Sequence, residues 1–120
     1  MHLTPATQSD AREICDLMNQ AYRGSQGWTS ERNLVEGDRI TVDQVQEMIL
    51  SPASVFLVHK ALGKIVACIC VEPSNGVAHI GSFAVAPQYQ GTGLGGSVIA
   101  WAEKYAQERL SAKKYTILVL

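Results

Sequence analysis

The sequence predicts an α/β domain in which a mixed, mostly antiparallel sheet is flanked by helices, with elements in the order β-α-α-β-β-β-α-β. Two patterns predict this class. Segments with apolar residues at helical spacing lie on both sides of several short runs rich in β-branched residues. Three of those runs follow one another with only turn residues between them. The length of 120 residues predicts one domain over residues 1–120.

The first half of the chain supplies two of the predicted helices. A short β-like entry precedes Asp10, which is expected to cap a helix over residues 11–22. Residues 23–39 contain glycines and mixed charges without a clear period, so they are predicted to form a loop or broken helix. Thr41 and Gln44 form a capping-box pattern that opens a helix ending near Leu50.

The second half supplies most of the sheet. Residues 54–60 and 64–72 are predicted strands of a hairpin, and Asn75-Gly76 is a turn signal before a strand over residues 77–85. A helix is predicted from Gly93 to about Leu110, and an apolar strand over residues 115–120. The last strand–helix–strand unit is expected to be a right-handed parallel crossover, and the three strands before that helix an antiparallel meander.

Composition limits the classes of function. Hydrophobic residues make up 47% of the chain and charged residues 18%, which is typical of a folded domain. A net charge of −1 argues against a dedicated nucleic-acid or membrane-surface binder. No apolar run approaches the roughly 18 residues of a membrane span, and the first residues lack the pattern of a secretory signal. No membrane partner and a cytoplasmic location are therefore expected.

The cysteines are expected to be reduced thiols. Cys68 and Cys70 lie two positions apart in a predicted strand, where they are poorly placed to form a disulfide with each other. The third cysteine is Cys15, and no further Cys or His residues occur at the spacing of a ligand set. The sequence therefore predicts no metal site.

A glycine-rich turn before the last helix is the strongest functional signal. Residues 91–96, "GTGLGG", fit the dinucleotide pattern G-x-G-x-x-G, while Gln90, Gly93 and Gly95 fit a different phosphate-binding pattern. Glycines at this place let backbone N–H groups approach an anion, and the helix N-terminus adds a partial positive charge. Four glycines in six positions exceed what a tight turn needs, which favours a ligand.

Two nucleotide-binding alternatives fail on context. A dinucleotide fold requires its glycines directly after the strand and an acidic residue about 20 positions later. Here residues 86–90 separate the strand from the glycines, and the chain ends without that acid. A triphosphate loop requires a Lys followed by Ser or Thr after the glycines, and neither pair is present.

Residues 79–106, "HIGSFAVAPQYQGTGLGGSVIAWAEKYA", resemble the acetyl-CoA signature of the GNAT superfamily of N-acetyltransferases. A strand ending in Phe83-Ala84-Val85, then a proline, then Gln-x-x-Gly-x-Gly at the start of a long helix carries the resemblance. Residues 27–39 also resemble the segment before the second helix in some members, so the resemblance covers nearly the whole chain.

The resemblance implies that acetyl-CoA is the co-substrate and that the strand and the turn bind it. Main-chain groups of Phe83 and Val85 would bind the pantetheine arm, and the Val85 N–H would stabilise the oxyanion. The residues implied for the pyrophosphate are Gln90, Gly91, Thr92, Gly93, Leu94, Gly95, Gly96 and Ser97. Many members carry basic residues at the positions of Thr92 and near Gly96, and here both are uncharged, so modest affinity with little salt dependence is expected.

In this family an amine, of a small molecule or a peptide, attacks the thioester directly. His79 is the first candidate for the general base, because some members place a catalytic glutamate at the corresponding position and because histidine suits the task. His79 is expected to share a strand face with Gly81, Phe83 and Val85. A half-buried structural histidine is the alternative. Glu72, at the end of the preceding strand, is the second candidate, with a turn carboxylate as its alternative.

The acceptor is expected to contact Trp28, Glu31 and Arg39, which lie in the segment that commonly walls the acceptor pocket in the family. Arg39 suits a substrate carboxylate, with an ordinary surface ion pair as the alternative. The family usually continues after the strand at residues 115–120 with another helix and two strands, so the domain is expected to be truncated after its fifth strand. Another copy of the chain is expected to cover that exposed strand, giving a homo-oligomer. The alternative to an enzyme is a non-catalytic coenzyme A-binding or dimerisation module.

Overall fold

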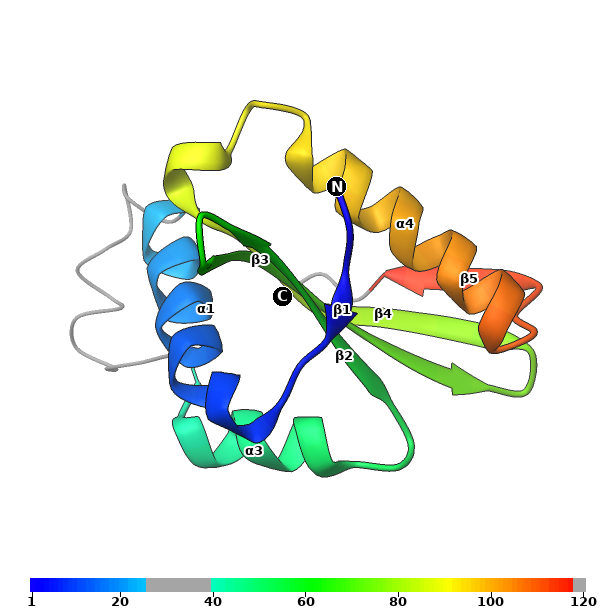
Figure 1. Cartoon of the computed structure of the whole chain (residues 1–120). Coiled ribbons are helices and arrows are strands. Elements are labelled where there is room, and N and C mark those ends of the chain that lie inside the picture. Colours follow the sequence, from blue (N-terminus) through cyan, green and yellow to red (C-terminus); the bar gives the residue numbers. More distant parts are fainter. Residues whose placement is uncertain (26–39, 118–120) are drawn as a thin grey trace.

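The protein is described by a computed structural model that covers residues 1–25 and 40–117. Its sheet has the strand order β1-β2-β3-β4-β5. All neighbours are antiparallel except β4 and β5, which are parallel and joined through a helix. The fold class and element order predicted from the sequence are thus confirmed (Figure 1). The strands are β1 (Thr4–Pro5), β2 (Val55–Ala61), β3 (Lys64–Ser74), β4 (Val77–Val85) and β5 (Lys114–Ile117).

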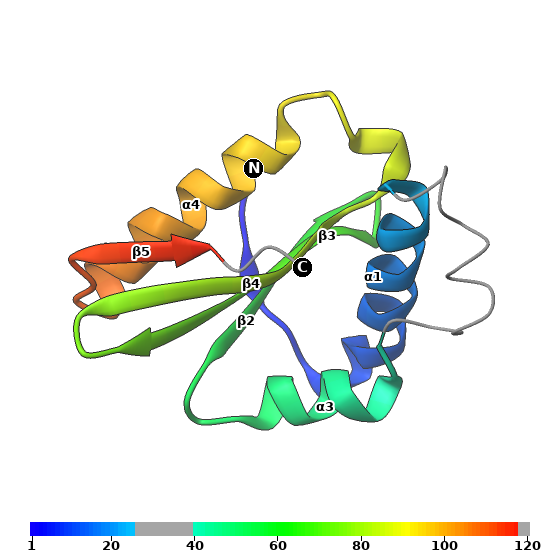
Figure 2. The same cartoon turned by 180° about the vertical axis from the view of Figure 1, so that it is seen from behind.

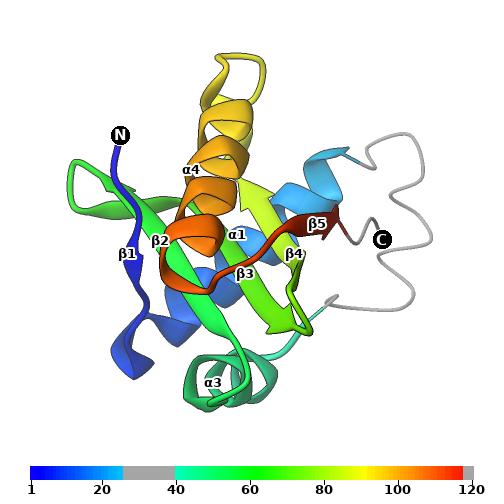
Figure 3. The same cartoon turned by 90° about the vertical axis from the view of Figure 1, so that its right-hand side faces the viewer.

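Helices cover both faces of the sheet. The α-helices are α1 (Ala11–Ser25), α3 (Val42–Leu50) and α4 (Leu94–Arg109), and short 3-10 turns are η1 (Gln8–Asp10) and η3 (Pro87–Tyr89). Helices α1 and α3 pack on one face, which we call the α1/α3 face, and α4 packs on the other, the α4 face (Figure 3). None of the helices among residues 1–25 and 40–117 is long and apolar enough to cross a membrane.

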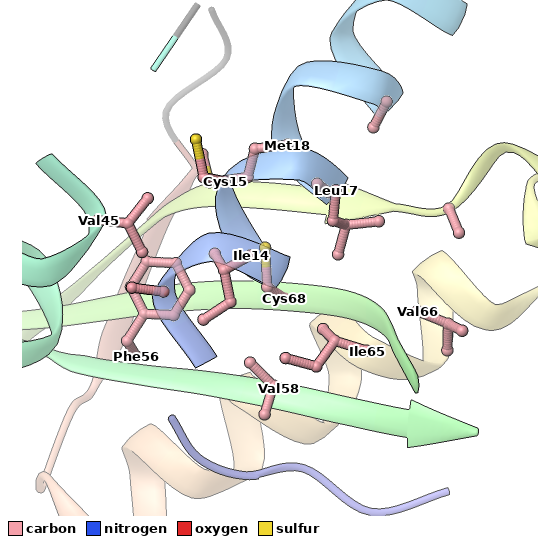
Figure 4. Packing of buried hydrophobic residues seen from close by; sticks show 14 residues of the cluster. Ile14, Cys15, Leu17, Met18, Val45, Phe56, Val58, Ile65, Val66 and Cys68 are labelled. Atoms are coloured by element: carbon pink, nitrogen blue, oxygen red, sulfur yellow. The ribbon is translucent and has the colours of Figure 1, made fainter. Parts of the chain in front are cut away.

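Each face of the sheet has its own apolar core. On the α1/α3 face, Ile14 and Val45 are fully buried together with Phe56 and Cys68 from the strands (Figure 4). On the α4 face, Val98 and Ala102 of the helix are fully buried against Ile80 of β4. Strands β2, β3 and β4 contribute buried residues to both cores, so they form the buried centre of the molecule.

The two hairpin turns fix the meander. Ala61 pairs with Lys64, which leaves Leu62 and Gly63 as a two-residue turn with φ values of 54° and 78°. Ser74 pairs with Val77 in the same way across Asn75 and Gly76, so the turn predicted there is confirmed. Two positive φ angles in a two-residue loop match the right-handed twist of the strands it joins.

The predicted helix starts have different outcomes. Thr41 Oγ1 accepts a hydrogen bond from the Gln44 N–H at 3.2 Å and Gln44 Oε1 accepts one from the Thr41 N–H at 2.9 Å, which confirms the capping box. The prediction that Asp10 caps α1 was wrong. Asp10 is the last residue of η1, and its carboxylate accepts a hydrogen bond from the preceding Thr7 N–H at 2.9 Å. A 3-10 turn thus leads into the helix in place of a side-chain cap.

Candidate functional site

The predicted cofactor loop lies where β4 ends and α4 begins, at the end of β4 away from the β3–β4 turn (Figure 2). The chain leaves β4 at Val85 and passes through η3, where the Tyr89 N–H donates to the Ala86 carbonyl at 2.9 Å. The Gln90 side chain reaches back, and its Nε2 donates to the Val85 carbonyl at 3.1 Å. The Gln90 N–H itself donates to Pro87, so this residue stabilises the loop through both groups.

Several N–H groups of the loop have no partner among the residues that the structure describes. Within residues 1–25 and 40–117, no acceptor bonds the N–H of Gly91, Gly93, Gly95 or Gly96. The Gly95 and Gly96 N–H groups belong to the first turn of α4, where the helix offers no carbonyl. The Ser97 N–H is the first to bond within the helix, to the Gly93 carbonyl at 3.1 Å. An anion is the natural partner for such a cluster of donors at a positive helix end.

Gly95 brings the helix close to the strand. A Cβ at Gly95 would lie 3.3 Å from Phe83 Cζ and 3.7 Å from Val85 Cγ2, whereas a Cβ at Gly96 would meet nothing within 4 Å. The loop itself turns through Gly91 and Gly93 with φ values of 79° and 89°, a conformation that costs other residues about 1–2 kcal/mol. The glycines therefore serve two purposes, a left-handed turn and a close approach.

Strand β4 extends beyond its described pairing with β5. Their pairing runs from Val77 with Lys114 to Ile80 with Ile117, whereas β4 continues to Val85. Within residues 1–25 and 40–117, no strand pairs with the outer edge of β4 beyond Ile80. A strand edge of this kind binds an extended ligand in the way it binds a further strand.

A bulge in β4 overturns one prediction. Cys70 pairs with Gly81 and Cys68 with Ala84, so β4 has one residue more than β3 between these pairs, and Ser82 has a φ of 49°. The extra residue reverses the side-chain alternation. Val85 therefore packs on the α4 face, while His79 points to the α1/α3 face. The expectation that His79 shares a face with Phe83 and Val85 was wrong, although Gly81 does share it.

Side chains from β3 and from α3 contact Ser82 at the bulge. Cys68 Sγ donates to the Ser82 carbonyl at 3.4 Å, and Ser82 Oγ lies 3.5 Å from the Met48 sulfur on α3. Neither Ser82 nor Met48 was identified from the sequence. The sequence does contain a pattern that indicates the bulge at Ser82, because a glycine inside a strand, here Gly81, often marks one.

The two predicted base candidates are direct neighbours across strands. Glu72 pairs with His79, and His79 pairs with Thr116 of β5. Glu72 is exposed and lies inside β3, which runs on to Ser74, so its predicted place at the end of the strand was wrong. His79 is half-buried, and its Nδ1 lies 2.7 Å from Thr116 Oγ1. The predicted acceptor residues Trp28, Glu31 and Arg39 lie outside the described residues.

Cys68 and Cys70 are free thiols, as predicted. Burial raises the pKa of the Cys68 thiol to about 12 and also raises the pKa of Cys70. A thiol with such a pKa stays protonated at neutral pH and is a poor nucleophile. The cysteines beside the bulge therefore have a packing role.

Comparison with known proteins bears on this site. The sequence profile of the acetyltransferase (GNAT) family matches residues 12–119, which is most of the chain. No curated protein matches the chain in sequence. Among solved structures, the PaiA N-acetyltransferase of Thermoplasma acidophilum, in complex with coenzyme A, is similar with a TM-score of 0.75 and 13% identity, over 90% of this chain and 72% of that one.

Two further structures are similar over almost the full chain. The ribosomal-protein-alanine N-acetyltransferase of Brucella melitensis gives a TM-score of 0.72 at 16% identity, with 100% of this chain and 81% of that chain covered. The aminoglycoside 6'-N-acetyltransferase of Acinetobacter haemolyticus gives 0.67 at 16% identity, with 99% and 79% covered. Identities this low establish a common fold. The family profile adds that the site described above lies in an acetyltransferase domain.

Proposed function

Because the chain belongs to the GNAT family of acetyltransferases, we propose that it transfers the acetyl group of acetyl-CoA to a primary amine of a small molecule or an amino terminus. The observation that carries this proposal is the cluster of N–H groups at Gly91, Gly93, Gly95 and Gly96, which have no acceptor within residues 1–25 and 40–117. It lies beside the stretch of β4 that no strand pairs among the same described residues. The cluster suits a pyrophosphate, and the strand edge suits the amide-bearing pantetheine arm.

The reaction needs a proton acceptor. A lysine-like amine has a pKa near 10.4, so its neutral form lies about 4.6 kcal/mol uphill at pH 7. In the proposed step the amine nitrogen bonds to the thioester carbon, and its proton passes to His79 Nε2. The C–S bond then breaks and the thiolate leaves, taking up a proton from the imidazolium or from water. His79 is half-buried, and its Nε2 has no hydrogen-bond partner within residues 1–25 and 40–117, which supports this role.

The oxyanion needs a donor on the cofactor side. We assign this role to the Val85 N–H, because Val85 ends β4 and lies against the first turn of α4. Its carbonyl is already bonded by the Gln90 side chain. This bond holds the Val85–Ala86 peptide, which follows the peptide that carries the Val85 N–H. Fixed donors stabilise developing charge without reorganising.

The proposed location is the cytoplasm, where acetyl-CoA is available and free cysteines such as Cys68 and Cys70 stay reduced. The proposed acceptor is an amine that reaches the α1/α3 face of β4, because His79 points there. We propose no metal for the step, because direct attack on a thioester requires none.

The decisive experiment measures thiol release from acetyl-CoA in the presence of a panel of amines and amino-terminal peptides. An acetyltransferase releases thiol only with an accepted amine, and mass spectrometry then finds the acetylated product. Coenzyme A binding by calorimetry runs in parallel. Binding without turnover on any amine would contradict catalysis and identify a coenzyme A-binding module, whereas absence of binding would contradict both.

A further inference from the structure

A row of polar side chains crosses three strands on the α1/α3 face. Glu72 of β3, His79 of β4 and Thr116 of β5 are successive partners in the sheet register. Thr116 is separated from His79 by 37 positions in the sequence, and only the parallel pairing of β4 with β5 brings them together. The proposed function makes no use of Thr116.

Thr116 makes a short hydrogen bond with His79. Their atoms Oγ1 and Nδ1 are 2.7 Å apart, and either atom is able to act as the donor. Within residues 1–25 and 40–117, the other ring nitrogen, Nε2, has no hydrogen-bond partner. In a neutral imidazole one nitrogen carries the proton and the other accepts. The direction of this bond therefore decides whether Nε2 is able to take a proton.

We propose that Thr116 is a positioning residue whose Oγ1 accepts the Nδ1–H of His79, which leaves Nε2 as the proton acceptor; this role rests on the proposed function. The reason is that the bond must survive the reaction. When Nε2 takes a proton, both ring nitrogens become donors, and a threonine oxygen still accepts from Nδ1. The opposite direction, with the threonine donating, would break at that moment and release the ring.

The chain contains an internal reference for this tautomer. His59 Nδ1 lies 2.9 Å from the His2 carbonyl oxygen. A carbonyl only accepts, so neutral His59 carries its proton on Nδ1. His59 lies on β2, and β3 and β4 separate that strand from β5. A change at Thr116 should leave it unaffected. The third histidine of the chain is His2.

The test is a long-range ¹H–¹⁵N spectrum of the free, full-length protein at a pH where the rings are neutral. We expect the His79 nitrogens to show the same pattern as His59, with the proton on Nδ1. A proton on Nε2 of His79 would overturn the proposal. This readout needs no substrate, so it stands whether or not acetyl transfer is observed.

Two variants extend the test. Thr116→Ser keeps the hydroxyl and should keep the His79 tautomer, whereas Thr116→Val removes it and should shift His79 toward a mixture while His59 is unchanged. Thr116 is exposed, so the exchange should leave folding intact. With an accepted amine, Thr116→Val should lower kcat about tenfold or more at an unchanged KM for acetyl-CoA, and Thr116→Ser should restore it. An unchanged His79 spectrum in Thr116→Val would overturn the proposal, whereas an inactive wild type would contradict the proposed function.

Discussion

At the scale of single residues, Gly95 and Gly96 are adjacent glycines with different surroundings. Both lie in the first turn of α4, where an alanine favours the helix by roughly 0.5–1 kcal/mol. A methyl group at Gly96 meets open space, but one at Gly95 meets Phe83 Cζ at 3.3 Å. We therefore expect Gly96→Ala to raise the free energy of unfolding by about 0.5 kcal/mol and Gly95→Ala to raise it less or lower it. Urea unfolding of the free protein measures both, and equal gains would contradict the contact with Phe83.

His79 is the residue on which the proposed chemistry depends. Replacing it by glutamine keeps a polar side chain on β4 but removes the group that takes the proton. We expect His79→Gln to lower kcat at neutral pH by about 10²–10⁴, with coenzyme A affinity unchanged. Glu72→Gln is the matched control, because Glu72 is the opposite partner on β3 and exposed. If Glu72→Gln showed the larger loss, the base would be Glu72.

The buried thiol of Cys68 should make stability fall in alkaline solution. Burial raises its pKa from 9.0 to about 12 in the folded chain. Above pH 9 the unfolded chain loses this proton while the folded chain keeps it, so stability is complete below pH 9 and is lost between pH 9 and about 12. At pH 10 the loss from this group is about 1.4 kcal/mol. Urea unfolding at pH 8 and pH 10 should show a smaller decline for Cys68→Ala than for the wild type, and equal declines would exclude the effect.

At the scale of elements, the bulge of β4 places Val85, beside the cofactor loop, and His79 on opposite faces of the sheet. Ser82 holds a φ of 49°, which glycine adopts freely and a β-branched residue resists. We expect Ser82→Gly to retain stability within about 0.5 kcal/mol and Ser82→Val to lower it by about 1–2 kcal/mol. Chemical unfolding of the two variants is the measurement. A tolerated Ser82→Val would mean that the strand adopts another register.

The sequence patterns predicted the helices, strands and turns well because they are local. Thr41 and Gln44 lie three residues apart, and Asn75-Gly76 acts within one turn, so each pattern is complete within a short segment. The bulge at Ser82 depends on pairing with β3. Strict alternation of side chains, which ignores the bulge, therefore wrongly predicted that His79 and Val85 share a face. The glycine loop was predictable for the same local reason, whereas the contact between Thr116 and His79 arises from strand pairing alone.

At the scale of the whole molecule, β5 is an edge strand of the sheet formed by residues 1–25 and 40–117. An edge strand presents unpaired N–H and C=O groups that recruit another strand. We propose that a second copy of the chain pairs there. Light scattering and sedimentation over a range of concentrations should find a dimer, with slower hydrogen exchange at β5 amides as concentration rises. A monomer at all concentrations would contradict the proposal.

The overall charge determines how the protein binds an anionic cofactor. A net charge of −1 gives no long-range attraction for an anionic cofactor, and the uncharged Thr92 and Gly96 add no positive charge to the cofactor loop. Binding should then depend on backbone donors at short range, where salt screens little. We expect the Kd for coenzyme A to change by less than about threefold between 50 and 500 mM salt.

A positive charge introduced into the cofactor loop gives a second test of how coenzyme A binding depends on salt. Thr92 is exposed in the loop, and its hydroxyl bonds the Tyr89 carbonyl. Thr92→Arg should tighten coenzyme A binding about threefold to tenfold at low salt, because a guanidinium pairs with phosphate oxygens. Thr92→Ala controls for the lost hydroxyl. The gain should disappear at high salt, since exposed charges are screened. A steep salt dependence in the wild type, or none in Thr92→Arg, would show that the phosphates bind elsewhere than at the N-terminus of α4.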